Sequence, residues 1–426
     1  MGRLGFVLIF ACLICATLAA PVRAGENDSS SSDVYARLRP EYDPGGMRVG
    51  AFTLFPSMSS GGGANSNVFN AEVGTQDFFY SLNAGAKLES VWSRHKFSLE
   101  GQTKSVWYSN QVSENRNDWN VNADLRLDVV RGTSFAFDAV YALEHEARGF
   151  EHAGGALEAS DPASPTLFRR NGFTGELKHT LNRLTLSLGG GWENLDYNDS
   201  ETLGSLIIPS EVINNDDRDR SVLKYQGKAA LEVWGDTSIF VRGIMLSTDY
   251  VAELDDAAVN RDSEEVLLDG GFAFEISHVL MGEMAAGLSQ KAFDDAALNE
   301  VSGVTANVKL KWYPSMLTNV TLVGGRSNLE TSIAGASSVI STKGGVTIDH
   351  ELLRNLILSG QVGYENAEYL DTIRNDDTLR GSLSTRYLIN NNLHLDAGWE
   401  FVDRTSTDQP FAYSGSQFQL SITGKM

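Results

Sequence analysis

The stretch WNVNADLRLDV, residues 119–129, alternates strictly between apolar and polar side chains. Successive side chains of a β-strand point to opposite faces of a sheet, so this segment would form one apolar face and one charged face. The same alternation returns in VTANVKLKW, residues 304–312, and in LHLDAGWEF, residues 393–401. Helical periodicity is nowhere comparable, so the sequence predicts an all-β protein.

The connections between the alternating segments differ regularly in length. Short turns are expected at 92–95, 131–134, 181–183, 234–236, 313–315 and 389–392, and longer polar loops at 60–76, 109–117, 148–165, 198–219, 250–264 and 403–412. Short turns on one side and long loops on the other are typical of outer-membrane barrels. We therefore expect a transmembrane antiparallel β-barrel of about eighteen strands over residues 48–426, or about sixteen because 239–247 and 333–348 are weakly patterned.

A soluble β-sandwich or propeller is the alternative to a barrel. Sandwich strands also alternate, but their turn signals recur about every 8–12 residues, whereas many segments here are longer than that. A propeller would need a repeated blade motif, and none is found. Tryptophans flank the apolar faces, as expected at a lipid–water boundary, at Trp119, Trp192, Trp234, Trp312 and Trp399.

The first 24 residues predict a secretory signal peptide. Arg3 precedes a short apolar run, and VRA ends at Ala24 with small residues where cleavage is expected. The apolar run is shorter than the roughly 20 residues that a spanning helix needs, and Pro21 lies at its end. Both cysteines of the chain lie in this segment, so we expect no disulfide in the exported protein.

Residues 25–47 are then expected to form a periplasmic extension before the barrel. Within it, RPEYDPGG (39–46) is predicted to be extended, because each proline biases its neighbour away from helix. MRVGAFTLFPSM (47–58) is predicted to be the first strand. It should pair with the terminal strand FQLSITGKM (418–426), so that the wall closes without a free edge.

Several chemistries are not supported by the sequence. A net charge of −21 disfavours nucleic acid, because phosphate binding needs a basic face. His145, Glu146, Glu151 and His152 share one loop, but no histidine pair has the spacing of a zinc protease. The glycine-rich stretch 59–67 lacks the Lys-Ser/Thr of a phosphate loop and is predicted to be a flexible loop. A barrel enzyme such as a lipid hydrolase would need a Ser–His pair on the lipid-facing parity, but the serines lie mostly on the polar parity or in loops. We therefore predict no enzyme activity. The sequence also predicts no cofactor and no metal site.

The polar parity predicts a hydrated lumen, since about eighteen strands enclose a bore too wide for wall side chains to fill. The candidate lumen-lining residues are Lys87, Asp124, Arg126, Asp128, Lys224, Lys228, Glu232, Lys309, Lys311, Arg380, Arg386, Asp396 and Glu400. Their mixed signs suit uncharged or weakly charged solutes, and carbohydrate hydroxyls can pair with both carboxylates and cations. Alternatively, these residues only solvate the interior and pair with one another.

The chain from about residue 37 to its end resembles a known family. Its motif residues are Arg39, Pro40, Tyr42, Asp43, Pro44, Arg48, Gly50, Phe52, Pro56, Asn67, Val68, Phe69, Trp92, Ser93, Arg94 and His95. In these positions the chain is similar to the family called putative beta-barrel porin 2, although Ser66 stands where that family usually has an acidic residue. The resemblance implies an outer-membrane barrel, and some members are associated with exopolysaccharide systems.

Three functions follow as expectations for a protein of the bacterial outer membrane. The first is an exit pore for an exported polysaccharide, which a periplasmic export protein would deliver. The second is a general diffusion porin for small hydrophilic solutes, and the third is a non-conducting structural or adhesive barrel with acidic loops. In each case the expected partners include outer-membrane lipid, lipopolysaccharide and the barrel-assembly machinery, and nucleic acid is not among them.

Overall fold

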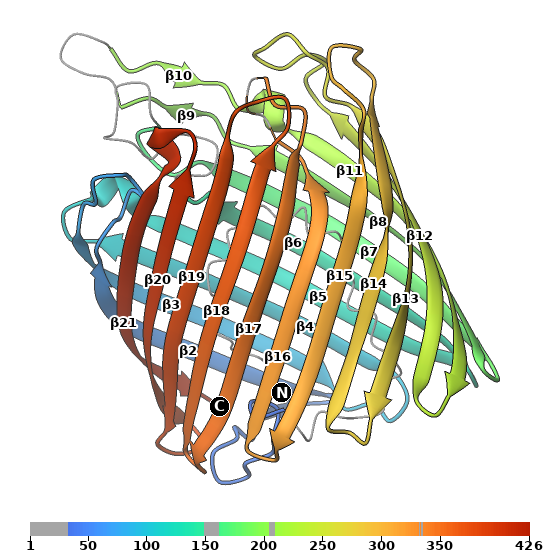
Figure 1. Cartoon of the computed structure of the whole chain (residues 1–426). Coiled ribbons are helices and arrows are strands. Elements are labelled where there is room, and N and C mark those ends of the chain that lie inside the picture. Colours follow the sequence, from blue (N-terminus) through green and yellow to red (C-terminus); the bar gives the residue numbers. More distant parts are fainter. Residues whose placement is uncertain (1–32, 149–161, 204–208, 332, 334) are drawn as a thin grey trace.

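The computed structural model describes residues 33–148, 162–203, 209–331, 333 and 335–426, and it consists of one large antiparallel sheet that closes on itself (Figure 1). The eighteen strands of the wall are β2 (Phe52–Asn65), β3 (Asp77–Ser90), β4 (Lys96–Tyr108), β5 (Arg116–Val130), β6 (Thr133–His145), β7 (Leu167–Leu181), β8 (Leu184–Tyr197), β11 (Arg220–Trp234), β12 (Thr237–Tyr250), β13 (Ser263–Ile276), β14 (Leu280–Phe293), β15 (Val301–Ser315), β16 (Thr318–Leu329), β17 (Val339–Leu353), β18 (Leu356–Tyr369), β19 (Asn375–Leu388), β20 (Leu393–Ser406) and β21 (Tyr413–Lys425). The prediction of an antiparallel barrel of about eighteen strands is confirmed.

Short elements lie outside the regular wall. They are the strands β1 (Met47–Val49), β9 (Ser200–Glu201) and β10 (Val212–Ile213), and the 3₁₀ turns η2 (Val112–Glu114), η3 (Asp216–Arg218) and η4 (Gln409–Phe411). No helix in the described ranges is long and apolar enough to cross a membrane.

The first and last wall strands close the barrel. Residues 57–65 of β2 pair with residues 417–425 of β21 in antiparallel register. The first and last strands close the wall as predicted, but the predicted partner segment 47–58 takes part only through Ser57 and Met58. Every other wall strand pairs with its neighbours in the chain, with β8 next to β11. Closure leaves no unpaired strand edge, so every wall strand has a hydrogen-bonded neighbour on both sides.

Alternation along the strands separates two surfaces. The register turns large apolar side chains outward, where Leu188 is 69% exposed and Leu420 is 52% exposed. The opposite parity turns charged side chains inward, where Lys224 and Asp396 are buried. Strands of 12–15 residues exceed the roughly 9–11 that a tilted strand needs to cross a hydrocarbon layer. Apolar surface of this extent is what a lipid environment requires.

The two ends of the barrel differ in their connections (Figure 1). At one end, here the short-turn end, two to five residues join successive strands, as at 131–132 and 91–95. At the other, the long-loop end, the connections include 66–76, 198–219 and 251–262. Residue 426 lies at the short-turn end, where its backbone N–H donates to the Pro56 carbonyl.

Aromatic side chains gather on the outer face near both ends. All five tryptophans predicted to flank the apolar band are on the outward parity. Trp119 packs against Tyr141 towards the long-loop end, with ring centroids 5.1 Å apart. Phe52 packs against Trp92 at the short-turn end, with centroids 5.6 Å apart. The apolar surface is therefore bordered by rings of the kind that favour a membrane interface.

The glycine-rich stretch is strand rather than the predicted flexible loop. β2 continues through Gly61, Gly62 and Gly63 to Asn65, so the prediction of a loop from residue 60 is wrong. Glycine is needed because the neighbouring chain approaches closely. A Cβ at Gly63 would lie 1.9 Å from the Phe418 carbonyl oxygen and 2.7 Å from the Phe79 ring.

The two weakly patterned segments are also largely strand. Residues 239–247 belong to β12, and most of 333–348 belongs to β17. In β12 the alternation is weak because both faces carry apolar residues: Ile239 and Val241 are exposed on the outside, while Phe240 and Ile244 are buried on the inside. The sixteen-strand alternative is therefore excluded.

The segment before the barrel differs from the extended chain predicted for 39–46. The backbone N–H groups of Tyr42 and Asp43 donate to the Arg39 carbonyl, which makes a turn. β1 then folds back on the start of β2, with Met47 opposite Leu54. The first wall strand thus begins at Phe52. The predicted signal peptide and residues 25–32 lie outside the described part of the chain.

Candidate functional site

The inner face of the barrel carries all thirteen candidate residues. Register partners in neighbouring strands point to the same face of the sheet, so the pairing identifies the inward residues of every strand around the barrel. The inward residues include Lys87, Asp124, Arg126, Asp128, Lys224, Lys228, Glu232, Lys309, Lys311, Arg380, Arg386, Asp396 and Glu400. Strict alternation in these strands is the reason that the sequence could place them.

Many inward charges form ion pairs between neighbouring strands. Arg242 of β12 and Asp269 of β13 are register partners, and their side chains meet at 2.6 Å. Arg386 of β19 and Asp396 of β20 meet in the same way at 2.7 Å. Lys228 of β11 reaches Glu283 of β14 at 2.9 Å, with two strands between them. These pairs neutralise much of the charge along the wall and leave a polar surface with a weak net field.

The remaining candidates have varied surroundings. Lys87 pairs with Glu89 at 2.7 Å, and Arg126 pairs with Asp128 at 3.3 Å. Lys224 and Lys309 make further interactions of their own. Asp124 lies opposite Asp138 in the register, and both Asp124 and Glu232 are exposed to the lumen. The candidates therefore form several separate clusters rather than one site.

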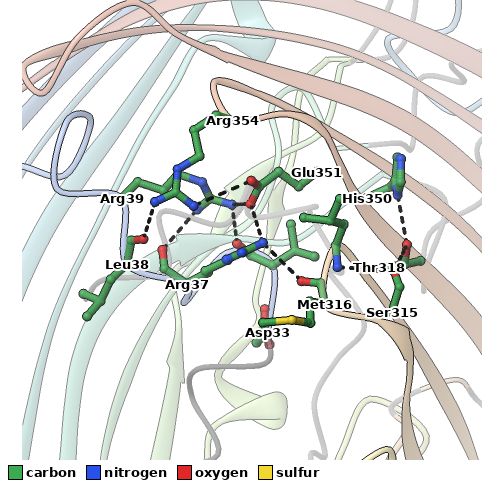
Figure 2. Close-up of polar contacts among 12 residues, drawn as sticks. Asp33, Arg37, Leu38, Arg39, Ser315, Met316, Thr318, His350, Glu351 and Arg354 are labelled. Atoms are coloured by element: carbon green, nitrogen blue, oxygen red, sulfur yellow. Dashed lines mark hydrogen bonds and ion pairs between the residues drawn. The ribbon is translucent and has the colours of Figure 1, made fainter.

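A folded N-terminal segment, residues 33–43, lies inside the short-turn end of the barrel (Figure 2). The Arg39 guanidinium is buried and lies 2.7 Å from the Glu351 carboxylate of β17. It also donates to the Val34 carbonyl, while its backbone N–H donates to the Asp43 carboxylate. Arg37 donates to the Met316 carbonyl in a short turn, which fixes the segment at this end.

The segment also packs against the inner wall. The Val34 side chain is fully buried, and its backbone N–H donates to Asn319 Oδ1 of β16 at 3.0 Å. The Tyr35 hydroxyl lies 2.9 Å from Ser359 Oγ of β18, and the Arg386 guanidinium lies over the Tyr35 ring. Burial raises the pKa of the Tyr35 phenol above its ordinary value. The segment thus covers part of the lumen along β16–β19.

At the opposite end, the first loop (residues 66–76) folds inward. Val68 is buried against Phe79, Val106 and Tyr108, which lie on the inner faces of β3 and β4. The Asn67 side chain donates to the carbonyls of Ala71 and Ser414 and accepts from the Ala71 N–H. Because these contacts hold the loop against the wall, it narrows the lumen at this end.

Other long loops are joined by a buried arginine. Arg261, in the connection between β12 and β13, pairs with Asp255 at 2.6 Å and donates to the carbonyls of Thr331 and Ala336. The loop that carries these carbonyls begins at Glu330, which pairs with Lys291 of β14. Burial disfavours the Glu330 carboxylate, but the Lys291 ammonium outweighs it and holds the pKa of Glu330 below its ordinary value.

A cavity of about 180 Å³ lies between the first loop and the wall. Its lining includes Asn67, Arg116, Arg380, Glu400 and Gln417. Arg380 and Glu400 are two of the sequence-predicted candidates, and the structure brings them together here. Arg116 was missed, because residues 109–117 were expected to form a loop. The inward residues of 119–129 have even numbers, and continuing that alternation upstream through Asp118 leads to Arg116.

The four residues expected to share one loop do not assemble a metal site in the described residues, and His145 is the last residue of β6 rather than part of the loop. His145 Nδ1 lies 2.8 Å from Asp118, and Glu146 pairs with Arg218 at 2.6 Å. Glu151 and His152 lie outside the described ranges. No group of three or more His, Cys, Asp or Glu side chains in those ranges is placed to hold a metal ion.

Comparison with known proteins identifies the sequence family. Residues 39–426 match the sequence model of the family described as "Putative beta-barrel porin 2". No curated protein sequence matches the chain.

Comparison with solved structures finds other barrels of low sequence identity. OpdL of Pseudomonas aeruginosa is similar with a TM-score of 0.44 and 11% identity, over 89% of this chain and 99% of that one. OccK2 (OpdF) of the same organism has a TM-score of 0.44 and 10% identity, over 88% and 97%. The ferric-catecholate import receptor Fiu of E. coli K12 has a TM-score of 0.45 and 8% identity, over 87% and 81%.

Proposed function

The chain belongs to the family described as "Putative beta-barrel porin 2", whose members are porin-like channels of the bacterial outer membrane, and we propose that this channel is the exit pore for an exported polysaccharide. The observation that carries the proposal is the inner wall, where charges of both signs are largely paired. Such a wall offers many hydrogen-bonding groups and a weak net field.

A polysaccharide suits this wall because each sugar unit presents several hydroxyl groups. Hydroxyls donate to carboxylates and accept from guanidinium and ammonium groups, so paired charges still bind them. Contacts spread over separate clusters, such as Arg242–Asp269 and Arg386–Asp396, would let a polymer move from one to the next. A single tight site would instead hold the polymer and slow its exit.

The N-terminal segment supports export rather than free diffusion. In outer-membrane barrels the short turns face the periplasm, so residues 33–43 would lie where a polymer enters. Their docking on β16–β19 reduces the opening at that mouth. We propose that a periplasmic export protein both delivers the polymer and displaces this segment. Outer-membrane lipid and lipopolysaccharide would contact the apolar outer wall, after insertion by the barrel-assembly machinery.

Gene deletion tests the proposal directly. Cells that lack the protein should lose extracellular polysaccharide and accumulate it in the periplasm, and the wild-type gene should restore export. Arg326→Gln is a matched complementation control, because Arg326 lies on the outward parity. Unchanged polysaccharide outside the deletion strain would contradict the proposal.

Diffusion of small solutes is the second candidate function, and the polar-lined cavity beside Arg380 and Glu400 favours it. Planar-bilayer recording separates the two candidates. A diffusion porin gives a steady, large conductance at rest. A regulated exit pore gives a small resting conductance that rises when residues 33–43 are removed.

A further inference from the structure

The cavity behind the first loop is bordered by an unbroken polar row. Five inward residues on five adjacent strands are successive register partners: Gln361, Ser382, Glu400, Gln417 and Asn65. All five line the cavity. In the next inward layer, glycine occupies two of the four positions, Gly363 and Gly415. Gly363 leaves room above the row, whereas the space over Gly415 is taken by Asn67 of the first loop, whose Cβ would lie 3.2 Å from a Cβ at that glycine. The geometry therefore gives a shallow wall of amide, hydroxyl and carboxylate groups.

Two cations face this row without ion-pair partners. Arg380 of β19 and Arg116 of β5 both line the cavity, with β20, β21, β2, β3 and β4 between their strands. Neither guanidinium lies within ion-pair distance of a carboxylate in the described part of the chain, and the buried Nε of Arg116 has no hydrogen-bond partner. Lys104 of β4 is near enough to interact electrostatically with both Arg116 and Glu400, but it does not line the cavity.

These groups contrast with the paired charges elsewhere on the wall. Arg242 and Arg386 each have a carboxylate within 2.7 Å, whereas Arg116 and Arg380 face an open cavity. Among the described residues, three carboxylates line the cavity, and two of them, Glu114 and Glu146, are paired with Arg148 and Arg218. Glu400 is then the carboxylate that faces Arg116 and Arg380. The cavity is therefore locally positive within a protein of net charge −21. A ligand that carried one negative charge and several hydroxyls would complete it.

We infer that this cavity is a binding subsite for a uronic acid unit, that is, a sugar that carries a carboxylate. The carboxylate would accept from Arg380 and Arg116, and the hydroxyls would pair with Glu400, Gln361 and Gln417. The cavity holds the equivalent of about six waters at about 30 Å³ each, which is the scale of one sugar residue. The inference deepens the proposed function, on which it rests, by naming an acidic polymer as the exported class.

The test uses the full-length processed protein and two probes of the same size. We expect D-glucuronate to bind about tenfold more tightly than D-glucose in calorimetric titration, because its carboxylate gains charge-assisted hydrogen bonds. Glucuronate binding by the wild type should weaken as KCl is raised, whereas glucose binding should not. Equal affinity for the two sugars, or glucuronate binding that salt does not change, would overturn the inference.

Variants locate the subsite. Arg380→Gln combined with Arg116→Gln should lower glucuronate affinity about tenfold and leave glucose affinity unchanged. Arg326→Gln removes an arginine from the outer face and should leave both affinities unchanged. Arg380→Lys keeps the charge without the planar fork, so it should give an intermediate loss. Wild-type glucuronate affinity in the double variant, verified as folded by heat modifiability, would overturn the assignment.

The exit pore and the uronic acid subsite are contradicted by different results. If deletion stops polysaccharide export but glucuronate binds no better than glucose, the subsite is wrong and the exit pore stands. If glucuronate binds selectively but export is unchanged by deletion, the exit pore is wrong and the site serves uptake of acidic sugars instead.

Discussion

Arg39 illustrates how a residue of the family motif acts in this protein. Its guanidinium is only 3% exposed and joins Glu351 and the Val34 carbonyl, while its backbone closes the turn with Asp43. Asn67 has a comparable role in the first loop, where its amide holds two backbone segments together. Both motif residues therefore stabilise the inserted segments, and Asn67 in addition lines the cavity beside Arg380 and Glu400.

Arg39→Gln should release the N-terminal segment. Removing one partner of a buried ion pair costs roughly 3–5 kcal/mol when the other charge is left alone. Here the Glu351 carboxylate keeps the longer contacts with Arg37 at 3.5 Å and Arg354 at 3.9 Å, so we expect a loss below that range. We expect faster proteolysis near residues 33–43 and a higher conductance in planar bilayers. Arg354→Gln is the matched control: Arg354 is 44% exposed and lies 3.9 Å from the same carboxylate. The loss of that exposed pair costs about 0–1 kcal/mol. Equal proteolysis rates and equal conductances for the two variants would contradict the claim that Arg39 holds the N-terminal segment in place.

Gly63→Ala should impair barrel assembly. The added methyl group would overlap the Phe418 carbonyl of β21, so β2 and β21 could not keep their register at the closing seam. Gly227→Ala is the control, because nothing lies within 4 Å of a Cβ at that position. The measurement is the yield of the heat-modifiable folded band in the outer-membrane fraction. Equal yields of the two variants would show that the seam tolerates the methyl group.

At the scale of single elements, alternation predicted strands well where the two faces differ. In β5 the apolar and charged faces are distinct, and the predicted stretch 119–129 lies within it. Prediction was weaker in β12, where inward Phe240 and Ile244 hide the pattern. It failed in the glycine-rich half of β2, because three glycines carry no side chains that could alternate. The physical reason for Gly61 and Gly63 is the close approach of β21, and for Gly62 it is the close approach of β3; a local pattern contains neither.

The loop that begins at Glu330 should loosen in acid. Because the folded-state pKa of Glu330 lies below its ordinary value of 4.5, its stabilising contribution is complete above 4.5. That contribution is lost as the pH falls through the lowered folded-state pKa. We expect the thermal unfolding midpoint of the wild type to fall as the pH is lowered from 7 to 3.

Glu330→Gln should lower the unfolding midpoint at pH 7, since Lys291 then loses its carboxylate partner. Its midpoint should also depend less on pH than that of the wild type. Glu264→Gln changes an exposed carboxylate on the outer face of β13 and serves as the control. Parallel pH curves for the wild type and Glu330→Gln would show that another group carries the acid response.

At the scale of the whole molecule, the barrel, its closure and its inward face could be predicted from sequence. All three depend on alternation and on strand order, which are local properties. The two inserted segments could not be predicted in the same way. The pair between Arg39 and Glu351 joins residues 312 positions apart, and the first loop meets β21 through Asn67 and Ser414. Such contacts follow only from the closed barrel.

The wall and the two inserted segments have different roles in the passage. The wall supplies a hydrated passage with largely paired charges, and the N-terminal segment and the first loop narrow it at opposite ends. Behind the first loop, Arg116 and Arg380, which have no ion-pair partner among the described residues, provide a local preference for negative charge. The protein therefore combines a passage of weak net field with one selective position.

The central claim is that the lumen is a passage for hydroxyl-rich solutes, and swelling of proteoliposomes in neutral oligosaccharides tests it most directly. Vesicles that contain the folded protein should swell faster than protein-free vesicles, and removal of residues 33–43 should increase the rate further. The claim would be contradicted if vesicles with the full chain and vesicles with the truncated variant both swelled no faster than protein-free vesicles.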